Sequence, residues 1–110
     1  LVALLRSSSP QPASVPIRAE LALSVLLAAW TSEPYLAVFE DEAEHLRGFD
    51  LYVLRQDSVL HQQEGAISCF VVDEFGMAFG YGATWPPRQL SLTELPLDQY
   101  MKIEPRITFP

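Results

Sequence analysis

Two apolar runs separated by a short acidic turn place the strongest constraint on how this chain can fold. The first run covers residues 66–73 and the second covers residues 77–82, and the tetrapeptide Asp-Glu-Phe-Gly, ending at Gly76, joins them. Asp favours the start of a tight turn, and glycine accepts the positive φ that many hairpin turns require. The stretch therefore predicts an antiparallel β-hairpin with an acidic tip at Asp73 and Glu74.

The first of these runs is apolar at alternate positions on both of its sides. Strand periodicity predicts that Ile67, Cys69 and Val71 share one face. Phe70 and Val72 then occupy the other face. A strand that is apolar on both faces is typical of the middle of a sheet that is covered on both sides. Residues 66–73 are therefore predicted to form a central strand.

Cys69 is the only cysteine in the chain. A single cysteine excludes an intrachain disulfide and a cysteine-rich metal site. A nucleophilic cysteine needs a partly exposed, electropositive setting, whereas Cys69 lies between apolar residues of a predicted strand. We therefore expect Cys69 to be a buried core residue.

The second strong signal is a helix from about Pro16 to about Thr31. This segment is rich in Ala and Leu, which are strong helix formers; Pro16 suits the first helical position, and Glu20 lies near the favourable end of the helix dipole. Its apolar residues lie almost all round the axis, which predicts cover on more than one side by a sheet, by the N-terminal arm or by another chain. Residues 21–30 are about half the length that spans a bilayer, so no membrane insertion is expected.

The remaining elements are predicted from periodicity and from proline and glycine positions. We expect strands at 35–40 and 49–56, a short strand at 58–62, and a polar loop or one helical turn at 41–48. Residues 82–88 are excluded from a strand by two adjacent prolines. Two short helical turns are expected within 91–102, where Ser91 and Glu94 have capping-box spacing, and an edge strand is expected at 103–109.

These elements predict an α+β fold in which one long N-terminal helix packs on an antiparallel sheet of four to five strands. A short helical segment is expected near residues 91–102. Residues 1–16, which are rich in Ser and Pro, are predicted to be an extended arm, and residues 17–110 a single domain. The chain begins at Leu1 rather than Met, as expected of a fragment, a processed product or a trimmed sequence.

The charge balance is acidic, with 14 Asp and Glu against 7 Lys and Arg and a formal net charge of -7. This charge opposes a phosphate backbone, so we expect no nucleic-acid partner. It favours either simple solubility or a basic partner. The single cysteine fits a reducing compartment, and we expect the protein to be cytoplasmic.

No motif in the sequence predicts catalysis or a cofactor. The two histidines, His45 and His61, lack the fixed spacings of zinc sites, so no metal site and no cofactor are predicted, and residues 40–45 are expected to form a solvated acidic segment. No nucleotide loop and no serine-hydrolase motif is present in the sequence. We therefore predict no catalytic residues, and the sequence favours a non-enzyme.

The most suggestive cluster for binding is Tyr81, Trp85 and Arg88 around Pro86 and Pro87. Trp, Tyr and Arg are the residues that most often carry interface energy, and two prolines lower the ordering cost of binding. The alternative for Trp85 is a structural role, folded back on the sheet.

The leading hypothesis is a small acidic protein-interaction domain, for example an inhibitor or an immunity-type protein, that binds a basic partner. Asp73 and Glu74 would attract the partner, and Tyr81, Trp85 and Arg88 would anchor it. The second hypothesis is self-association or an accessory role in a larger protein. The third is an α+β domain that binds a small molecule or acts as an enzyme, with its pocket at the helix–sheet interface.

Overall fold

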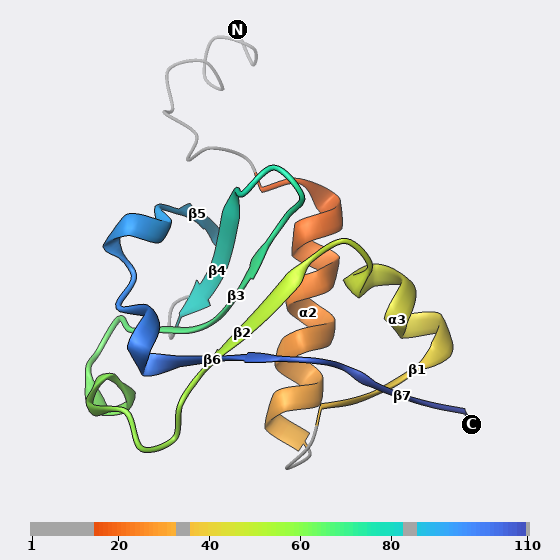
Figure 1. The fold of residues 1–110 in the computed structure, drawn as a ribbon, viewed down its shortest axis with the longest axis horizontal. Helices are drawn as coiled ribbons and strands as arrows, with labels where there is room; N and C mark the ends of the chain where they lie inside the picture. Colours follow the sequence, from red (N-terminus) through yellow and green to blue (C-terminus); the bar gives the residue numbers. More distant parts are fainter. Residues whose placement is uncertain (1–14, 33–35, 83–85, 110) are drawn as a thin grey trace, which may run out of the picture.

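The computed structural model describes residues 15–32, 36–82 and 86–109. The fold is α+β, as predicted: a long helix packs on an antiparallel sheet of five strands (Figure 1). A second, short helix and a small parallel strand pair complete it. The helices and strands, in chain order, are α2 (Ile17–Ser32), β1 (Ala37–Phe39), α3 (Glu40–Leu46), β2 (Asp50–Leu54), β3 (Ile67–Val72), β4 (Ala78–Gly82), β5 (Arg88–Leu90), β6 (Tyr100–Ile103) and β7 (Arg106–Thr108).

The main sheet has the strand order β5-β4-β3-β2-β6, and each neighbouring pair is antiparallel. Helix α2 runs behind this sheet in Figure 1, while the connections that contain the short 3-10 helices lie at the other side. Strands β1 and β7 form a separate parallel pair. The chain therefore has two sheet faces to cover and only one long helix with which to cover them.

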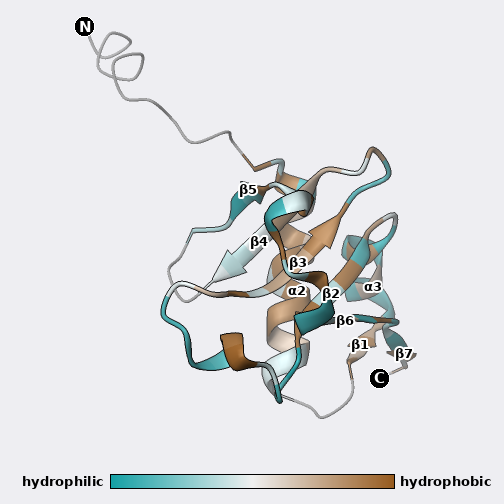
Figure 2. Ribbon diagram, turned by 60° about the vertical axis from the view of Figure 1, so that its left-hand side comes forward, coloured by the Kyte–Doolittle hydropathy of each residue, from teal (hydrophilic) through white to brown (hydrophobic). Residues whose placement is uncertain are grey.

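Strand β3 is the centre of the structure and is buried on both faces, as predicted. Cys69 and Val71 point toward α2 and are fully buried against residues such as Leu23 and Leu26. On the opposite face Phe70 belongs to a second core, which also includes Val72. Figure 2 shows the hydrophobic colour concentrated along β3 and α2.

The prediction that Ile67 shares a face with Cys69 is wrong. The register with β4 shifts between these two residues, because Ile67 pairs with Gly82 while Cys69 pairs with Tyr81. An extra residue in one strand is a β-bulge, which reverses the alternation of side chains beyond it. Ile67 consequently packs with Phe70 on the face that lies away from α2.

The hairpin predicted between β3 and β4 is present. The side-chain Oδ1 of Asp73 accepts hydrogen bonds from the backbone N–H groups of Phe75 and Met77, both at 2.9 Å. Gly76 has a φ of 81°, a conformation that costs a residue with a side chain about 1–2 kcal/mol. The residues Asp and Gly at the two ends of the tetrapeptide therefore determine the turn.

Helix α2 is covered on two sides, as its apolar circumference predicted. One side packs on β3 and β4, and the neighbouring side packs on α3 and β1. Near the start of the helix, the Arg18 guanidinium donates to the backbone oxygen of Arg47 at 3.2 Å and lies 5.0 Å from the centre of the Phe49 ring. Ile17 and Leu21 remain exposed on the outer side. Among the described residues, no helix is long and apolar enough to cross a membrane.

The second core, on the face away from α2, is built on aromatic contacts. The Tyr52 and Phe70 rings stack with centroids 4.6 Å apart, and Tyr100 meets Phe70 edge-on at 5.1 Å. The Tyr100 hydroxyl donates a buried hydrogen bond of 2.6 Å to the backbone oxygen of Ile67. This bond joins the edge strand β6 to the start of β3.

Several local predictions are corrected in the connections. Residues 59–62 form a 3-10 helix rather than part of a strand, with the Ser58 hydroxyl accepting from the Leu60 N–H at 3.0 Å. Most of residues 41–48, predicted as a polar loop or one helical turn, belong to α3, which already begins at Glu40, the predicted end of a strand; Gly48 follows α3 with a φ of 86°. The Ser58 cap favours the 3-10 helix over the predicted short strand, and the acidic first turn of α3 favours a helix there.

The region after β4 departs most from its prediction. The short strand β5 was not predicted, and it starts at Arg88, directly after the two prolines. The expected helical turns are two 3-10 helices, Leu92–Glu94 and Leu97–Gln99, and Tyr100 already belongs to strand β6. The capping box does not form, because the Ser91 hydroxyl bonds to that of Thr93 at 2.8 Å. The predicted edge strand at the end of the chain is β7, which pairs with β1 and not with the main sheet.

We predict that the Cys69 thiol reacts with an alkylating reagent only after the protein opens. Its side chain is 0% exposed, and burial raises its pKa to about 12, so the reactive thiolate is suppressed in the folded state. An opening free energy of at least ~5 kcal/mol slows labelling by more than about a thousandfold relative to the denatured chain. A Cys69→Ala variant carrying Gln56→Cys, at an exposed turn, is the control and should label quickly when folded. Rapid native labelling of Cys69 would contradict the central position of β3.

Candidate binding site

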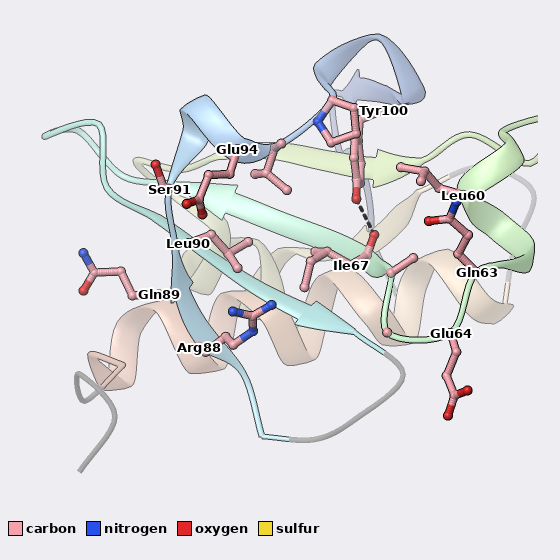
Figure 3. Close-up of a pocket in the computed structure, with 14 residues that line it drawn as sticks. Leu60, Gln63, Glu64, Ile67, Arg88, Gln89, Leu90, Ser91, Glu94 and Tyr100 are labelled. Atoms are coloured by element: carbon pink, nitrogen blue, oxygen red, sulfur yellow. Dashed lines mark hydrogen bonds between the residues drawn. The ribbon is translucent and has the colours of Figure 1, made fainter. Parts of the chain in front are cut away.

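A pocket of about 290 Å³ lies on the sheet face opposite α2 (Figure 3). One wall is formed by β5 and the 3-10 helix that follows it, and the other by the connection between β2 and β3. We call it the Arg88 pocket. Its lining residues used below are Leu60, Gln63, Glu64, Ile67, Arg88, Leu90, Ser91, Glu94, Leu95 and Tyr100.

Next to the pocket, strand β4 presents only small residues to this face of the sheet. Ala78, Gly80 and Gly82 alternate along the strand on the side away from α2. A methyl group at Gly80 would collide with the Leu90 side chain and lie 3.0 Å from Cγ2 of Ile67. A methyl group at Gly82 would lie 3.0 Å from the backbone oxygen of Ala66. Glycine therefore allows the side chains of β3 and β5 to lie over the β4 backbone.

The inner surface of the pocket is apolar. Ile67, Leu90 and Tyr100 belong to or pack against the second core, and Leu60 and Leu95 extend the same surface on the two walls. Burial, with a smaller electrostatic contribution from Cys69, raises the pKa of Tyr100, so its hydroxyl stays protonated. The protonated hydroxyl donates its hydrogen bond to the Ile67 carbonyl, and this bond holds the floor of the pocket in place.

The rim of the pocket is polar and carries both signs of charge. Arg88, Ser91 and Glu94 come from the β5 wall, and Gln63 and Glu64 come from the opposite wall. In Figure 3 the guanidinium of Arg88 points toward the pocket, whereas the Gln89 and Glu64 side chains point away from it. The Arg88 guanidinium makes no hydrogen bond or ion pair with any other residue of the described ranges. A cation with unused donors thus lies beside an apolar surface.

The predicted binding residues do not come together on one surface. Tyr81 points toward the α2 side of the sheet, half-buried, while Arg88 pairs with Gly80 and faces the pocket on the other side. Asp73 and Glu74 lie at the hairpin tip, at the opposite end of β4 from Gly82. Trp85 lies outside the described residues. Arg88 is thus the one member of the predicted set, among those described, that lines the pocket.

The two acidic residues at the hairpin tip differ in what they do. Asp73 is occupied by the turn, since its carboxylate accepts two backbone N–H groups. The Glu74 side chain is exposed and lies next to Gly48. A methyl group added at Gly48 would be 3.3 Å from the Glu74 carboxylate and 3.3 Å from the Arg18 guanidinium. Asp73 therefore has a structural role, and Glu74 remains available to a partner.

The sequence analysis did not identify the Arg88 pocket. Its residues come from positions 60 to 100, and only the folded sheet brings the two connections together over β3 and β4. The alternation of Ala78, Gly80 and Gly82 indicated only that neighbouring side chains can lie close over this strand. No local pattern indicated which side chains would surround it.

Cys69 is buried and protonated, and within residues 15–32, 36–82 and 86–109 no group of three or more His, Cys, Asp or Glu side chains could hold a metal ion. The pocket contains a cation, carboxylates and an apolar floor, which is a set suited to recognition. No protein-family model, curated protein or solved structure matches this chain.

We predict that Tyr100→Phe lowers the free energy of unfolding by ~1–2 kcal/mol, because it leaves the buried Ile67 carbonyl without its hydrogen bond. Tyr52→Phe is the matched control: this tyrosine stacks on the same Phe70 ring, but its hydroxyl has no partner among the described residues. Urea unfolding of both variants measures the difference. Equal stability losses in the two variants would mean that the hydrogen bond contributes nothing specific.

Proposed function

We propose that this chain is a small acidic protein-interaction domain that receives an apolar side chain of its partner in the Arg88 pocket. The observation that carries the proposal is the Arg88 guanidinium, which has no partner among the described residues and lies beside the apolar surface of Ile67, Leu90 and Leu95. Interfaces place their binding energy in such arrangements, where an apolar anchor fills a pocket and an Arg supplies directed hydrogen bonds at its edge.

The charge of the chain supports a basic partner. The net charge is -7, and the acidic residues of α3 lie on the surface together with Glu74 and the rim residues Glu64 and Glu94. Charge of one sign attracts an oppositely charged partner over distance and speeds encounter, while buried apolar contacts determine how long the complex lasts. An inhibitor or an immunity-type role against a basic protein fits this combination of an acidic surface and an apolar contact.

The size of the pocket favours a side chain over an enclosed small molecule. Pockets for drug-sized ligands range over about 300–1,000 Å³ and bury most of the ligand. The Arg88 pocket, at about 290 Å³, lies at the bottom of that range and opens to solvent between its two walls. A protruding side chain of a larger partner needs only this much cover.

We predict that peptides selected on this domain depend on Leu95 and not on Leu97. Selection would use two displayed peptide libraries, one with free amino termini and one with free carboxyl termini. Leu95→Asp places a charge against the apolar pocket and should weaken selected peptides at least about tenfold, because the charge must be desolvated on binding. Leu97→Asp makes the same change at an exposed position outside the pocket and should have no effect. Circular dichroism and thermal unfolding show whether both variants remain folded.

If neither library yields a binder, the interaction proposal fails. If the selected peptides bind wild type, Leu95→Asp and Leu97→Asp equally well, the domain binds through another surface. Arg47→Gln is a further control, because it lowers the net charge by one, as Leu95→Asp does, at an exposed residue that pairs with Glu44 at 2.7 Å. Unchanged affinity in this variant shows that a change of net charge alone does not explain the effect of Leu95→Asp.

Self-association is a second candidate, favoured by the parallel pair β1–β7. Parallel strands are usually buried on both faces, yet Phe39 is 47% exposed, Ile107 is 49% exposed and the following Phe109 is 73% exposed. Ile107 and Phe109 are two positions apart, so they point to the same side, and exposed apolar side chains placed together are typical of a surface that another chain covers. A second copy of this chain would supply that cover.

We predict that the wild-type chain forms a concentration-dependent dimer in sedimentation velocity and that Ile107→Lys shifts it to the monomer. The charge is expected to prevent burial of the β1–β7 surface, with a loss of affinity of at least about tenfold. Val59→Lys is the control, since Val59 is also apolar and is even more exposed, at 74%, but lies in the β2–β3 connection. A wild-type chain that remains monomeric at every concentration would exclude this candidate.

A further inference from the structure

The charge and geometry of the Arg88 pocket narrow the class of ligand that it can receive. We propose that its ligand is the C-terminal end of a polypeptide that finishes in an apolar residue, preceded by basic residues. This inference rests on the proposed function, because it specifies which part of a protein partner enters the pocket. In the complex, Arg88 binds the terminal carboxylate and the last side chain rests on Ile67, Leu90 and Leu95.

The first step of the argument concerns Arg88. A guanidinium offers five N–H donors in a planar fork, and none of them is used within the described ranges. The group that satisfies this fork with two parallel hydrogen bonds is a carboxylate or a phosphate. Because Figure 3 shows the guanidinium directed toward the pocket, the anion that it binds lies at the mouth, above the apolar floor.

The second step concerns the distance between the anion and the apolar group. Arg88, Leu90 and Ile67 line the same pocket, and Figure 3 shows the long Arg88 side chain turned with its guanidinium toward the apolar surface of the other two. The ligand must therefore present a carboxylate directly beside its apolar side chain. In an extended peptide, neighbouring side chains point in opposite directions, and side chains on the same side are ~7 Å apart along the strand. At a C-terminus, the carboxylate and the last side chain are attached to the same Cα atom. A terminal residue therefore meets both demands without bending the backbone.

The third step concerns the acidic rim. Glu94 lies on the same wall as Arg88, and Glu64 lies across the pocket. These carboxylates disfavour a ligand that carries several negative charges, and the net charge of -7 acts in the same direction. A single carboxylate held by Arg88 is tolerated, and basic residues upstream of it gain from the rim. Phosphorylated ligands are disfavoured for the same reason.

The test uses two synthetic peptides with the same sequence, Lys-Arg-Ser-Lys-Ala-Leu, each with fluorescein at the amino end. One ends in a free carboxylate and the other in a carboxamide. Fluorescence anisotropy at low salt should give at least about tenfold tighter binding for the free acid, because a hydrogen bond to a charged group is worth ~1.5–3 kcal/mol. Arg88→Gln should reduce the affinity for the free acid to that for the amide and leave the amide unchanged. Arg47→Gln should change neither.

A third peptide separates a terminal carboxylate from an internal one. It carries the amide end and an Asp in place of Ala, so that its carboxylate belongs to an internal side chain. Weaker binding of this peptide than of the free acid is expected. Equal binding of these two would overturn the assignment to a chain terminus.

The remaining outcomes distinguish the two proposals. If free acid and amide bind equally and Leu95→Asp weakens both, the carboxylate inference is overturned while the interaction function stands. If no peptide binds, yet the library with free amino termini yields binders that depend on Leu95, the inference is again overturned alone. If no synthetic peptide binds and neither library yields a binder, both proposals fail together.

Discussion

The structure depends on one strand, β3, that must be covered on both faces. Phe70 and the pair Cys69 and Val71 point in opposite directions from adjacent positions and are all fully buried. Burying apolar surface is the dominant favourable contribution to folding, so each face of β3 requires its own cover. Helix α2 covers one face, and the other face is covered by the aromatic residues of β2 and β6 together with the chain connections. The rest of the fold follows from these two requirements.

The two covers differ in quality, and this difference locates the candidate site. A helix presents a regular row of side chains that can fill the spaces of a sheet, as Leu23 and Leu26 do. Connections with short 3-10 helices fill space less evenly, and over β4 they meet a strand face made of Ala78, Gly80 and Gly82. The result is a hollow whose floor is well ordered by the Tyr100 hydrogen bond but whose top is open. Binding surfaces commonly arise in this way, on irregular segments held by a rigid sheet.

The sequence predicted those parts of the fold that local patterns determine. The helix over 17–32, the hairpin around Gly76 and the burial of Cys69 each depend on residues that are close in the chain. The prediction failed at the bulge before Cys69 and at strands β5 and β6, because pairing with distant strands determines those features. Tyr100 reads as part of a short helix in the sequence, yet in the structure it pairs with Leu54. Long-range pairing overrides weak local propensity.

For the candidate site, the sequence singled out Arg88 but could not place its neighbours. The proximity of Tyr81 and Arg88 in the chain implied a shared surface, whereas the alternation of strand side chains and the turn between β4 and β5 separate them across the sheet. Glycines are read as turn or bulge signals in a sequence, and only the packed structure shows what fills the space above them. The sequence therefore predicted one residue of the site, Arg88, and did not predict how the site is arranged.

The bulge between Ile67 and Cys69 allows one strand to serve two separate layers. Because the alternation changes at this point, the residue that forms the pocket floor is removed from the set that holds α2. Substitutions at the pocket floor therefore disturb the second core and leave the layer that packs on α2 unchanged.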